Sequence, residues 1–325
     1  MTHSAASRLG LKGTLGRLQP AHIPEDSQAT ITVSPLPLPQ VVGPWELVRS
    51  LKEGRLYRLF SARPRGQSER LPPAYAIKCL RPELEHEARA VAFLAREAAV
   101  AQSVKNRRII PVFASQLDRP PYFLVMPLLE GQDLASYLGR MGRLSIPQAL
   151  WIARQTAEGL AALHSQGWMH GDVKPSNIFL SPLGQATLLD LGFARRLDPP
   201  EPTNASWLLG TLTYMAPEKI TSTLRADIRS DLYSLGVIFY EMLAGRPPFT
   251  HAQPGDLARA HLQEVPPEIT RFRPYIPRRL VALLRRLLAK DPLRRPQTPE
   301  ELVERLVDLE IATFDTRDPQ PCSGN

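Results

Sequence analysis

The alternation of apolar and polar positions begins near residue 45 and divides the chain into zones. Residues 1–43 are rich in Ser, Thr, Pro and Gly without sustained periodicity, which predicts a disordered N-terminal extension. From residue 45 onward, short apolar runs are separated by turn signals, a pattern that predicts strands. These runs are WELVRSL (45–51), LYRLFSAR (56–63) after a turn at Gly54, and AYAIKCL (74–80).

Helical periodicity dominates the rest of the chain. A long helix is predicted over about 83–104, and after YFLVMPLLEG (122–131) the pattern is mostly helical. The sequence therefore predicts an α+β fold, with a small, mostly stranded part that carries one long helix and a larger, mostly helical part. At 325 residues the chain is too long for one small core, which also favours two lobes or domains.

A predicted hairpin interrupts the helical part at 177–190. Two short apolar runs, NIFL and TLLDL, are joined by SPLGQ, whose Pro and Gly indicate a turn. If the turn is centred between Leu183 and Gly184, Asn177 and Asp190 face each other at the open end. Their oxygen atoms would suit a hard cation such as Mg²⁺, although turn chemistry is the simpler use of such a pair.

Two more charged residues are expected at the same end of the hairpin. Pro175 keeps 172–176 out of regular structure, so Asp172 and Lys174 should lie on a neighbouring loop. Two acids, an amide and a lysine that converge in this way favour a functional site over a simple turn.

Two ionisable residues fall on apolar faces of predicted elements. Glu97 lies on the apolar face of the long helix, four residues after Phe93 and three before Val100. Lys78 lies within the apolar strand YAIKCL. Because a buried charge requires a partner, a Lys78–Glu97 ion pair would satisfy both residues. The alternative is that each side chain reaches solvent separately.

Composition restricts the classes of partner. The net charge of +8 permits anionic partners, but basic surfaces without a dedicated polyanion partner are common, and no nucleic-acid partner is expected. Seven basic residues on or near one C-terminal helix are interpreted as a solvated helix face, with Arg295 in an ion pair, rather than as a nucleic-acid site. They are Arg278, Arg279, Arg285, Arg286, Lys290, Arg294 and Arg295.

Cysteine content fits a reducing compartment, and hydropathy bears on membrane spans and signal peptides. Cys79 and Cys322 are the two cysteines, and their separation predicts neither a disulfide framework nor a zinc site. No apolar run reaches the roughly 18 residues of a membrane span, and the N-terminus lacks the compact apolar stretch of a signal peptide. The sequence is therefore expected to have no membrane span and a cytoplasmic location.

Several short segments resemble, in order and spacing, the motifs of the eukaryotic-type protein kinase domain, and most closely those of the bacterial serine/threonine kinases. These segments are YAIK (75–78), HGDVKPSN (170–177), DLG (190–192), MAPE (215–218), RSDLYSLGVIFYEMLAGRPPF (229–249) and DPLRRP (291–296). The resemblance covers about 45–310. It implies a bilobal kinase fold with an N-lobe over 44–127, a C-lobe over 128–312 and a tail over 313–325.

The resemblance implies roles for the charged residues in phosphoryl transfer from ATP to a Ser or Thr hydroxyl of a protein substrate. Lys78 would bind the α- and β-phosphates and would be oriented by Glu97. Asp172 would accept the substrate hydroxyl proton, and Lys174 would stabilise charge on the transferred phosphoryl group. The Mg²⁺ ligands would be Asn177 and Asp190.

The resemblance also implies an adenine pocket. The base would lie between Ala76 and Phe179, and its edge would bond the hinge that follows Met126. Pro127 has no N–H group and would offer only its carbonyl, so the N–H of Leu129 would be the donor.

One further ion pair is implied by the resemblance. Glu218 of the MAPE segment would pair with Arg295 of the DPLRRP segment. This pair would stabilise the C-lobe and would take no part in the reaction.

Three positions depart from the family pattern. The phosphate loop, usually G-x-G-x-x-G, reads KEGRLY (52–57) and keeps only Gly54, which limits the approach of backbone N–H groups to phosphates. Leu191 replaces a phenylalanine, and Gly171 replaces the catalytic-loop arginine. An active serine/threonine kinase is the favoured interpretation. The alternatives are a pseudokinase that binds nucleotide or partners without turnover and a kinase for a small molecule.

The glycine at position 171 concerns control rather than chemistry. In the family, the arginine pairs with a phosphate on the activation segment, here about 190–218. Gly171 has no side chain to receive such a phosphate, while Asp172 is retained. Activity is therefore expected to depend little on phosphorylation at Thr203 or Ser206.

Overall fold

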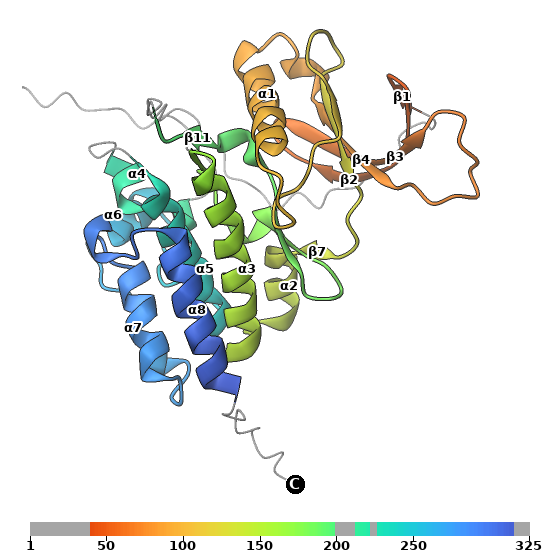
Figure 1. Cartoon of the computed structure of the whole chain (residues 1–325). Helices are drawn as coiled ribbons and strands as arrows, with labels where there is room; N and C mark the ends of the chain where they lie inside the picture. Colours follow the sequence, from red (N-terminus) through yellow and green to blue (C-terminus); the bar gives the residue numbers. More distant parts are fainter. Residues whose placement is uncertain (1–39, 199–211, 222–225, 315–325) are drawn as a thin grey trace, which may run out of the picture. The chain divides into compact units, whose positions relative to one another are not determined.

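The computed structural model describes residues 40–198, 212–221 and 226–314 (Figure 1). The activation-segment residues Thr203 and Ser206 lie outside these ranges, as do Cys322 and residues 1–39 of the predicted extension.

The N-terminal part is a six-stranded antiparallel sheet with the strand order β1-β2-β3-β4-β6-β5. Its strands are β1 (Gln40–Val42), β2 (Trp45–Glu53), β3 (Tyr57–Pro64), β4 (Tyr75–Leu80), β5 (Ala114–Gln116) and β6 (Phe123–Pro127). Strand β1 belongs to the segment that the sequence pattern assigned to the extension. It pairs with β2 across a tight turn, so the sheet begins before the predicted boundary at residue 44.

The long helix of the N-terminal part, α1 (Ala88–Ser103), begins five residues later than predicted. A short 3₁₀ helix, η1 (Pro82–Leu84), precedes α1. Glu87, the N-cap residue of α1, has extended backbone angles. The reason is burial: no residue of η1 is buried, whereas α1 turns Ala90, Leu94 and Glu97 inward. Helical propensity alone does not extend a helix over residues that have no apolar face to pack.

The C-terminal part is mostly helical, and α3 lies at its centre, packed against α5 and α8 (Figure 1). Ser145 and Gln148 form a capping box that sets the start of α3. Its helices are α2 (Leu134–Met141), α3 (Ile146–Ser165), α4 (Pro217–Thr221), α5 (Ile228–Ala244), α6 (Pro254–Gln263), α7 (Arg278–Leu287) and α8 (Pro299–Phe314). The last helix thus extends two residues beyond the predicted lobe boundary at 312.

Short elements connect these helices. The strands are β7 (Gln132–Asp133), β8 (Trp168–Met169), β9 (Ile178–Leu180), β10 (Ala186–Leu188) and β11 (Arg195–Arg196). The 3₁₀ turns are η2 (Pro175–Asn177), η3 (Leu191–Phe193), η5 (Leu212–Tyr214), η6 (Ile269–Arg271) and η7 (Pro292–Arg294). The N-terminal sheet with its long helix α1 and the mostly helical C-terminal part confirm the predicted α+β class.

The hairpin β9–β10 has a register that differs by one residue from the predicted one. Ile178 pairs with Leu188, and the N–H of Leu189 donates to the carbonyl of Asn177 at 2.9 Å. Asn177 therefore faces Leu189, and the prediction that it faces Asp190 is wrong. The connection is a three-residue loop that ends at Gly184, whose φ of +70° is the left-handed conformation that such loops require.

Of the basic residues predicted to form a solvated face near α7, Arg278, Arg279, Arg285 and Arg294 are exposed, whereas Arg295 is buried. Arg285 pairs with Glu268 at 2.8 Å and Arg286 with Glu301 at 3.3 Å. Lys290 lies over the Phe249 ring, 4.3 Å from its centroid. Among the described residues, no helix is long and apolar enough to cross a membrane.

Candidate active site

Lys78 and Glu97 form a buried ion pair between the sheet and α1. Lys78 lies on the central strand β4, opposite Leu59 on one side and Leu124 on the other. Its Nζ is 2.6 Å from Oε2 of Glu97, and the Glu97 side chain is only 2 % exposed. This is the pair that the apolar surroundings of both residues predicted from the sequence.

Asp190 joins the same cluster. Its Oδ1 lies 2.8 Å from Nζ of Lys78, so the lysine links the sheet to the segment after β10. Asp190 has φ 61° and ψ 68°, a left-handed conformation that is uncommon for a residue other than glycine. Packing of the next turn on α1 holds this conformation, since the Phe93 and Phe193 rings lie 4.8 Å apart.

Within this cluster, Lys78 and Asp190 stabilise each other's charged form. Burial by itself would lower the pKa of Lys78, but the carboxylates of Asp190 and Glu97 outweigh it and raise that pKa. Burial likewise opposes ionisation of Asp190, yet Lys78 holds its pKa below the ordinary value. Lys78 is therefore a cation and Asp190 an anion at neutral pH.

Asp172, Lys174 and Asn177 meet on the loop between β8 and β9. The Lys174 Nζ lies 2.7 Å from Oδ2 of Asp172. The amide nitrogen of Asn177 donates to the carbonyl of Asp172 at 2.9 Å and to its Oδ2 at 3.1 Å. The loop thus brings the predicted acid, lysine and amide into direct contact and fixes the orientation of the acid.

Buried groups from the helical part hold the backbone just before Asp172. Asp231 of α5 accepts the N–H of His170 at 2.6 Å and the N–H of Gly171 at 3.0 Å. Lys219 of α4 donates to the carbonyl of Gly171. Asp231 and Lys219 were not predicted to have a role, although Asp231 is part of the RSDLYSLG segment and Lys219 directly follows MAPE.

Glycine is required at position 171 by the backbone. Its φ is +82°, and a Cβ atom there would lie 2.4 Å from the carbonyl oxygen of Phe193. Any side chain would strain the loop or displace the turn after Asp190. The absence of arginine at this position is therefore tied to the local conformation, a constraint that the sequence did not reveal.

The residues predicted around the adenine come from both the N-terminal sheet and the C-terminal part. Ala76 is buried on β4 and pairs with Met126 on β6, while Pro127 ends that strand. Phe179, on β9, is half-buried and faces Asp133 of β7.

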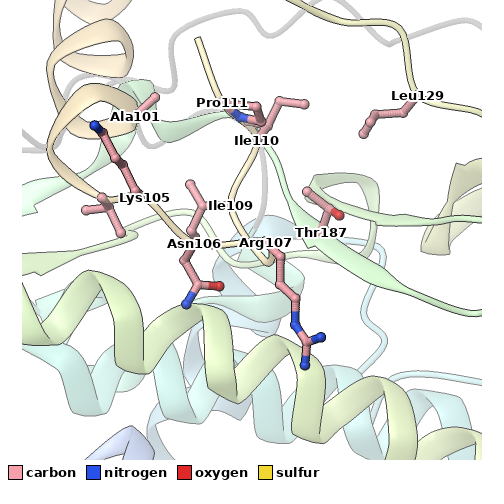
Figure 2. Close-up of a pocket in the computed structure, with 10 residues that line it drawn as sticks. Ala101, Lys105, Asn106, Arg107, Ile109, Ile110, Pro111, Leu129 and Thr187 are labelled. Carbon is pink, nitrogen blue, oxygen red and sulfur yellow. The ribbon is translucent and has the colours of Figure 1, made fainter.

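The Leu129 side chain points elsewhere, into a pocket of about 360 Å³ (Figure 2). The end of α1, the segment after it and Thr187 of β10 form the other walls of this pocket. It has none of the charged groups Lys78, Asp172 and Asp190 in its lining, and Leu129 is the one predicted site residue among its walls.

The degenerate phosphate loop forms a tight turn closed on itself. The N–H of Gly54 donates to the carbonyl of Tyr57 at 2.8 Å, and Arg81 donates to the carbonyl of Gly54 at 3.3 Å. The one glycine that the loop retains therefore uses its N–H group within the turn.

The oxygen atoms near the hairpin fit a divalent cation. Asn177 uses its amide nitrogen to bond Asp172, which leaves its amide oxygen as the atom to offer a metal. Asp190 has a second carboxylate oxygen besides the one that Lys78 contacts. Carboxylate and amide oxygens are ligands that Mg²⁺ accepts, with phosphate oxygens and water completing its shell.

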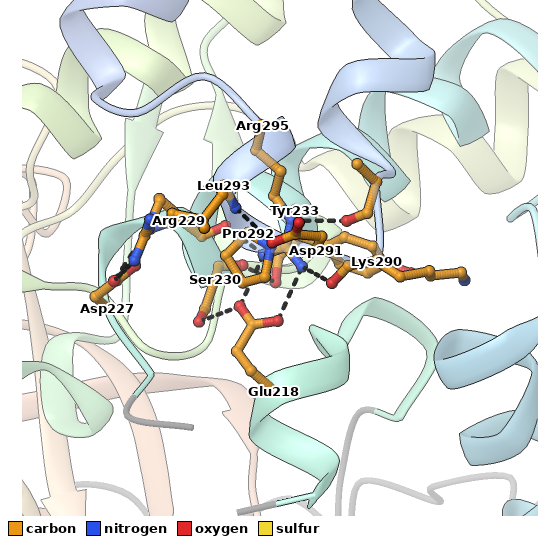
Figure 3. Close-up of polar contacts among 12 residues, drawn as sticks. Glu218, Asp227, Arg229, Ser230, Tyr233, Lys290, Asp291, Pro292, Leu293 and Arg295 are labelled. Atoms are coloured by element: carbon orange, nitrogen blue, oxygen red, sulfur yellow. Dashed lines mark hydrogen bonds and ion pairs between the residues drawn. The ribbon is translucent and has the colours of Figure 1, made fainter. Parts of the chain in front are cut away.

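A second buried ion pair lies in the helical part, between Glu218 of α4 and Arg295 (Figure 3). The two closest atoms are 2.7 Å apart, and the side chains are 3 % and 0 % exposed. Ser230 also donates to Glu218 at 2.7 Å. The pair implied by the sequence resemblance is present, and it ties α4 to the start of α5 and to the segment before α8.

This chain is similar to several bacterial serine/threonine-protein kinases. The chain is 34 % identical over 272 residues to the serine/threonine-protein kinase pkn2 of Myxococcus xanthus, which covers 81 % of this chain and 32 % of that protein. It is 29 % identical over 263 residues to PrkC of Bacillus subtilis, with 81 % and 40 % covered. For PknD of Mycobacterium tuberculosis the identity is 32 % over 262 residues, with 79 % and 39 % covered. The chain thus spans about a third to two fifths of the length of these relatives.

The protein kinase domain family matches residues 61–306, which is more than half of the chain. The matched range contains Lys78, Glu97, the 170–177 loop, Asp190 and the Glu218–Arg295 pair. The fold, the two ion pairs and this match lead to one conclusion: the chain belongs to the protein kinase family.

Proposed function

We propose that this chain is a serine/threonine protein kinase that transfers the γ-phosphoryl group of ATP to Ser or Thr hydroxyls of protein substrates. The observation that carries the proposal is the contact of Asp172 with both Lys174 and Asn177, beside an Asp190 that contacts Lys78. The names of the relatives, which are serine/threonine kinases, support the choice of substrate class.

Asp172 is the group that would receive the proton of the substrate hydroxyl. The hydroxyl oxygen would form the new bond to the γ-phosphorus as the bond to ADP breaks, and its proton would pass to the Asp172 carboxylate. Asn177 restrains this carboxylate through its Oδ2, and Asp231 restrains the backbone before it. Lys174, 2.7 Å from Asp172, would stabilise negative charge on the moving group.

Lys78 would bind the α- and β-phosphates, and Glu97 would hold its ammonium group in place. Mg²⁺ bound through Asn177 and Asp190 would neutralise phosphate charge. The adenine is assigned to Ala76 and Phe179, and its hydrogen bonds to the backbone of Pro127 and Leu129. These last roles follow from the family resemblance.

Control of this enzyme is proposed to be independent of a phosphorylated activation segment. The catalytic loop has its own fixed anchors: Asp231 accepts two of its N–H groups and Lys219 donates to the carbonyl of Gly171. Both anchors are buried and need no phosphate to be in place.

The test is transfer of labelled phosphate from ATP in the presence of Mg²⁺, with the purified full chain and a generic protein substrate. We expect labelled protein Ser and Thr, and no labelling with the Asp172→Asn variant. An unlabelled substrate and an unlabelled chain, with confirmed binding of ATP, would contradict kinase activity.

A pseudokinase that binds nucleotide or partners is the second candidate. It is favoured by one observation, the closed turn at Gly54, which uses the N–H group that a phosphate loop would offer to nucleotide. Stabilisation of the chain by ATP against thermal unfolding, without any phosphate transfer, would support this candidate.

A further inference from the structure

Tyr57 lies at the start of β3, where the phosphate-loop pattern has its third glycine. The strand pairing places Tyr57 opposite Leu80 and Leu59 opposite Lys78, so Tyr57 is two residues from the position that faces the lysine. Its ring lies against the ammonium group: the Lys78 Nζ is 4.5 Å from the ring centroid. A tyrosine side chain thus lies beside the group assigned to the phosphates.

The ammonium group of Lys78 is fully engaged in this arrangement. An ammonium has three N–H donors. One serves Glu97 at 2.6 Å, one serves Asp190 at 2.8 Å, and the ring of Tyr57 covers the group as a third partner. A phosphate can reach Lys78 only if one of these partners withdraws.

The ring is the partner most easily displaced. A contact between a cation and a ring is weaker than a charged hydrogen bond to a buried carboxylate. The Tyr57 hydroxyl is moreover buried without a hydrogen-bond partner in the described part of the chain, an unfavourable state that exposure to water would relieve. Burial also raises the pKa of this hydroxyl, so Tyr57 stays neutral and gains no charge attraction to Lys78.

We propose that the Tyr57 ring occupies the phosphate subsite and competes with the phosphates of ATP for Lys78. This inference rests on the proposed function, because it takes Lys78 as the phosphate-binding residue. It gives the degenerate phosphate loop a specific consequence: nucleotide binds only after Tyr57 turns away, so the ring lowers affinity for phosphate-bearing nucleotides and leaves adenosine unaffected.

The experiment measures dissociation constants of Mg-ATP, Mg-ADP and adenosine by calorimetry on the full chain and on two variants. Tyr57→Ala removes the ring, and Tyr57→Phe keeps the ring and removes only the hydroxyl. We expect Tyr57→Ala to bind Mg-ATP about tenfold more tightly, a change of about 1.4 kcal/mol. Tyr57→Phe should bind Mg-ATP no more tightly than the wild type, because it keeps the ring and removes the unfavourable burial of the hydroxyl, and adenosine affinity should not change in either variant.

A double-mutant cycle with Lys78→Met identifies the competition as one for Lys78. In that background Tyr57→Ala should give no further gain in Mg-ATP affinity. A gain of equal size there would overturn the proposal, because the ring would then act independently of Lys78. Equal tightening of adenosine would also overturn it, because the ring would then lie outside the phosphate subsite.

The remaining outcomes are equally decisive. A gain in Mg-ATP affinity for Tyr57→Phe as large as that for Tyr57→Ala would refute competition by the ring, because the hydroxyl alone would then oppose nucleotide binding. No gain in Tyr57→Ala, including a failure of both proteins to bind nucleotide, would refute it too. Tighter binding by Tyr57→Ala without any phosphate transfer would support the role of Tyr57 and count against the kinase function, so the two proposals fail separately.

Discussion

Two buried ion-pair centres in this protein use different cations, a lysine and an arginine. The difference indicates which centre can bind a ligand and which can only stabilise the fold. Lys78 serves the centre between the sheet and α1, with Glu97 and Asp190 as partners. Arg295 serves the centre in the helical part, with Glu218 as partner. Both cations are enclosed by protein, yet only the first has partners that it can exchange.

Every N–H of Arg295 is used. Its Nε donates to the carbonyl of Ala289 at 2.8 Å, and its Nη1 and Nη2 bind the two oxygens of Glu218 at 2.7 and 2.9 Å. The two remaining hydrogens go to the carbonyls of Arg229 and Lys290 at 2.9 and 3.0 Å. A planar guanidinium satisfied in this way is a permanent crosslink, because no donor is left for a ligand.

Lys78 differs because its charge is compact and its partners are unequal. Glu97 is enclosed, with 2 % of its side chain exposed, whereas the Asp190 side chain is 32 % exposed. The third partner is a neutral ring. One strong partner and two weaker ones would allow the lysine to keep its position while it accepts the phosphate that we propose it binds, whereas the guanidinium of Arg295 has no spare donor for a ligand.

The largest expected effect falls on the reaction. Asp172→Asn should lower the rate of phosphate transfer by roughly 100- to 10,000-fold, the usual range for the loss of a general base. The affinity for Mg-ATP and the unfolding temperature should stay close to those of the wild type. The reason is that Asn177 and Lys174 can still donate hydrogen bonds to the amide oxygen of the asparagine introduced at position 172. Transfer near the wild-type rate, in a preparation free of other kinases, would refute the assignment.

The next effect falls on stability. Glu218→Gln leaves the charge of Arg295 buried without its counter-charge and should lower the free energy of unfolding by about 3–5 kcal/mol. The matched change in the other centre, Asp190→Asn, leaves Lys78 paired with Glu97 and should lower it by less than about 1 kcal/mol. Urea unfolding of both variants measures the contrast, and equal losses would show that the two centres do not differ.

The contribution of Glu218 should also depend on pH. Burial opposes ionisation of its carboxyl, but the hydrogen bonds from Arg295 and Ser230 outweigh burial and hold its pKa below the ordinary value. Stability from a lowered pKa is fully present above the ordinary glutamate value, about 4.3, and is lost as pH falls through the folded value. The difference in unfolding free energy between wild type and Glu218→Gln should therefore shrink as pH falls below about 4.

A smaller effect is expected on nucleotide binding. Asp190→Asn removes a charged oxygen ligand and should weaken Mg-ATP binding about tenfold, or about 1.4 kcal/mol. Binding of adenosine without Mg²⁺ is the control and should be unchanged. If both Mg-ATP affinity and transfer match the wild type, Asp190 is not a metal ligand.

The smallest effect is expected in the activation segment. The double variant Thr203→Ala/Ser206→Ala should retain kcat/KM on a peptide substrate within tenfold of the wild type, since Gly171 offers no side chain to a phosphate. A loss of about tenfold or more, equivalent to about 1.4 kcal/mol, would mean that phosphorylation controls activity by another route. Restoring arginine at position 171 is a poor control, because φ is +82° there and a Cβ atom would meet the Phe193 carbonyl.

The sequence by itself determined which elements form and which charges need partners. Apolar periodicity around Glu97 and the apolar strand around Lys78 indicated that both charges need compensation, by an ion pair or by separate exposure to solvent, and the kinase resemblance favoured the pair. The kinase motifs added the Glu218–Arg295 pair. These predictions succeeded because each depends on local pattern or on a motif that fixes a residue's place in a known fold.

Only the tertiary structure decided how the elements meet. The hairpin register depends on a three-residue loop with Gly184 in a left-handed conformation, and a shift of one residue placed Leu189 rather than Asp190 opposite Asn177. The left-handed turn at Asp190 brings its carboxylate to Lys78, and the pairing of β3 with β4 brings the Tyr57 ring there as well. Such contacts join residues distant in the chain, so they depend on packing between elements, which local sequence patterns do not encode.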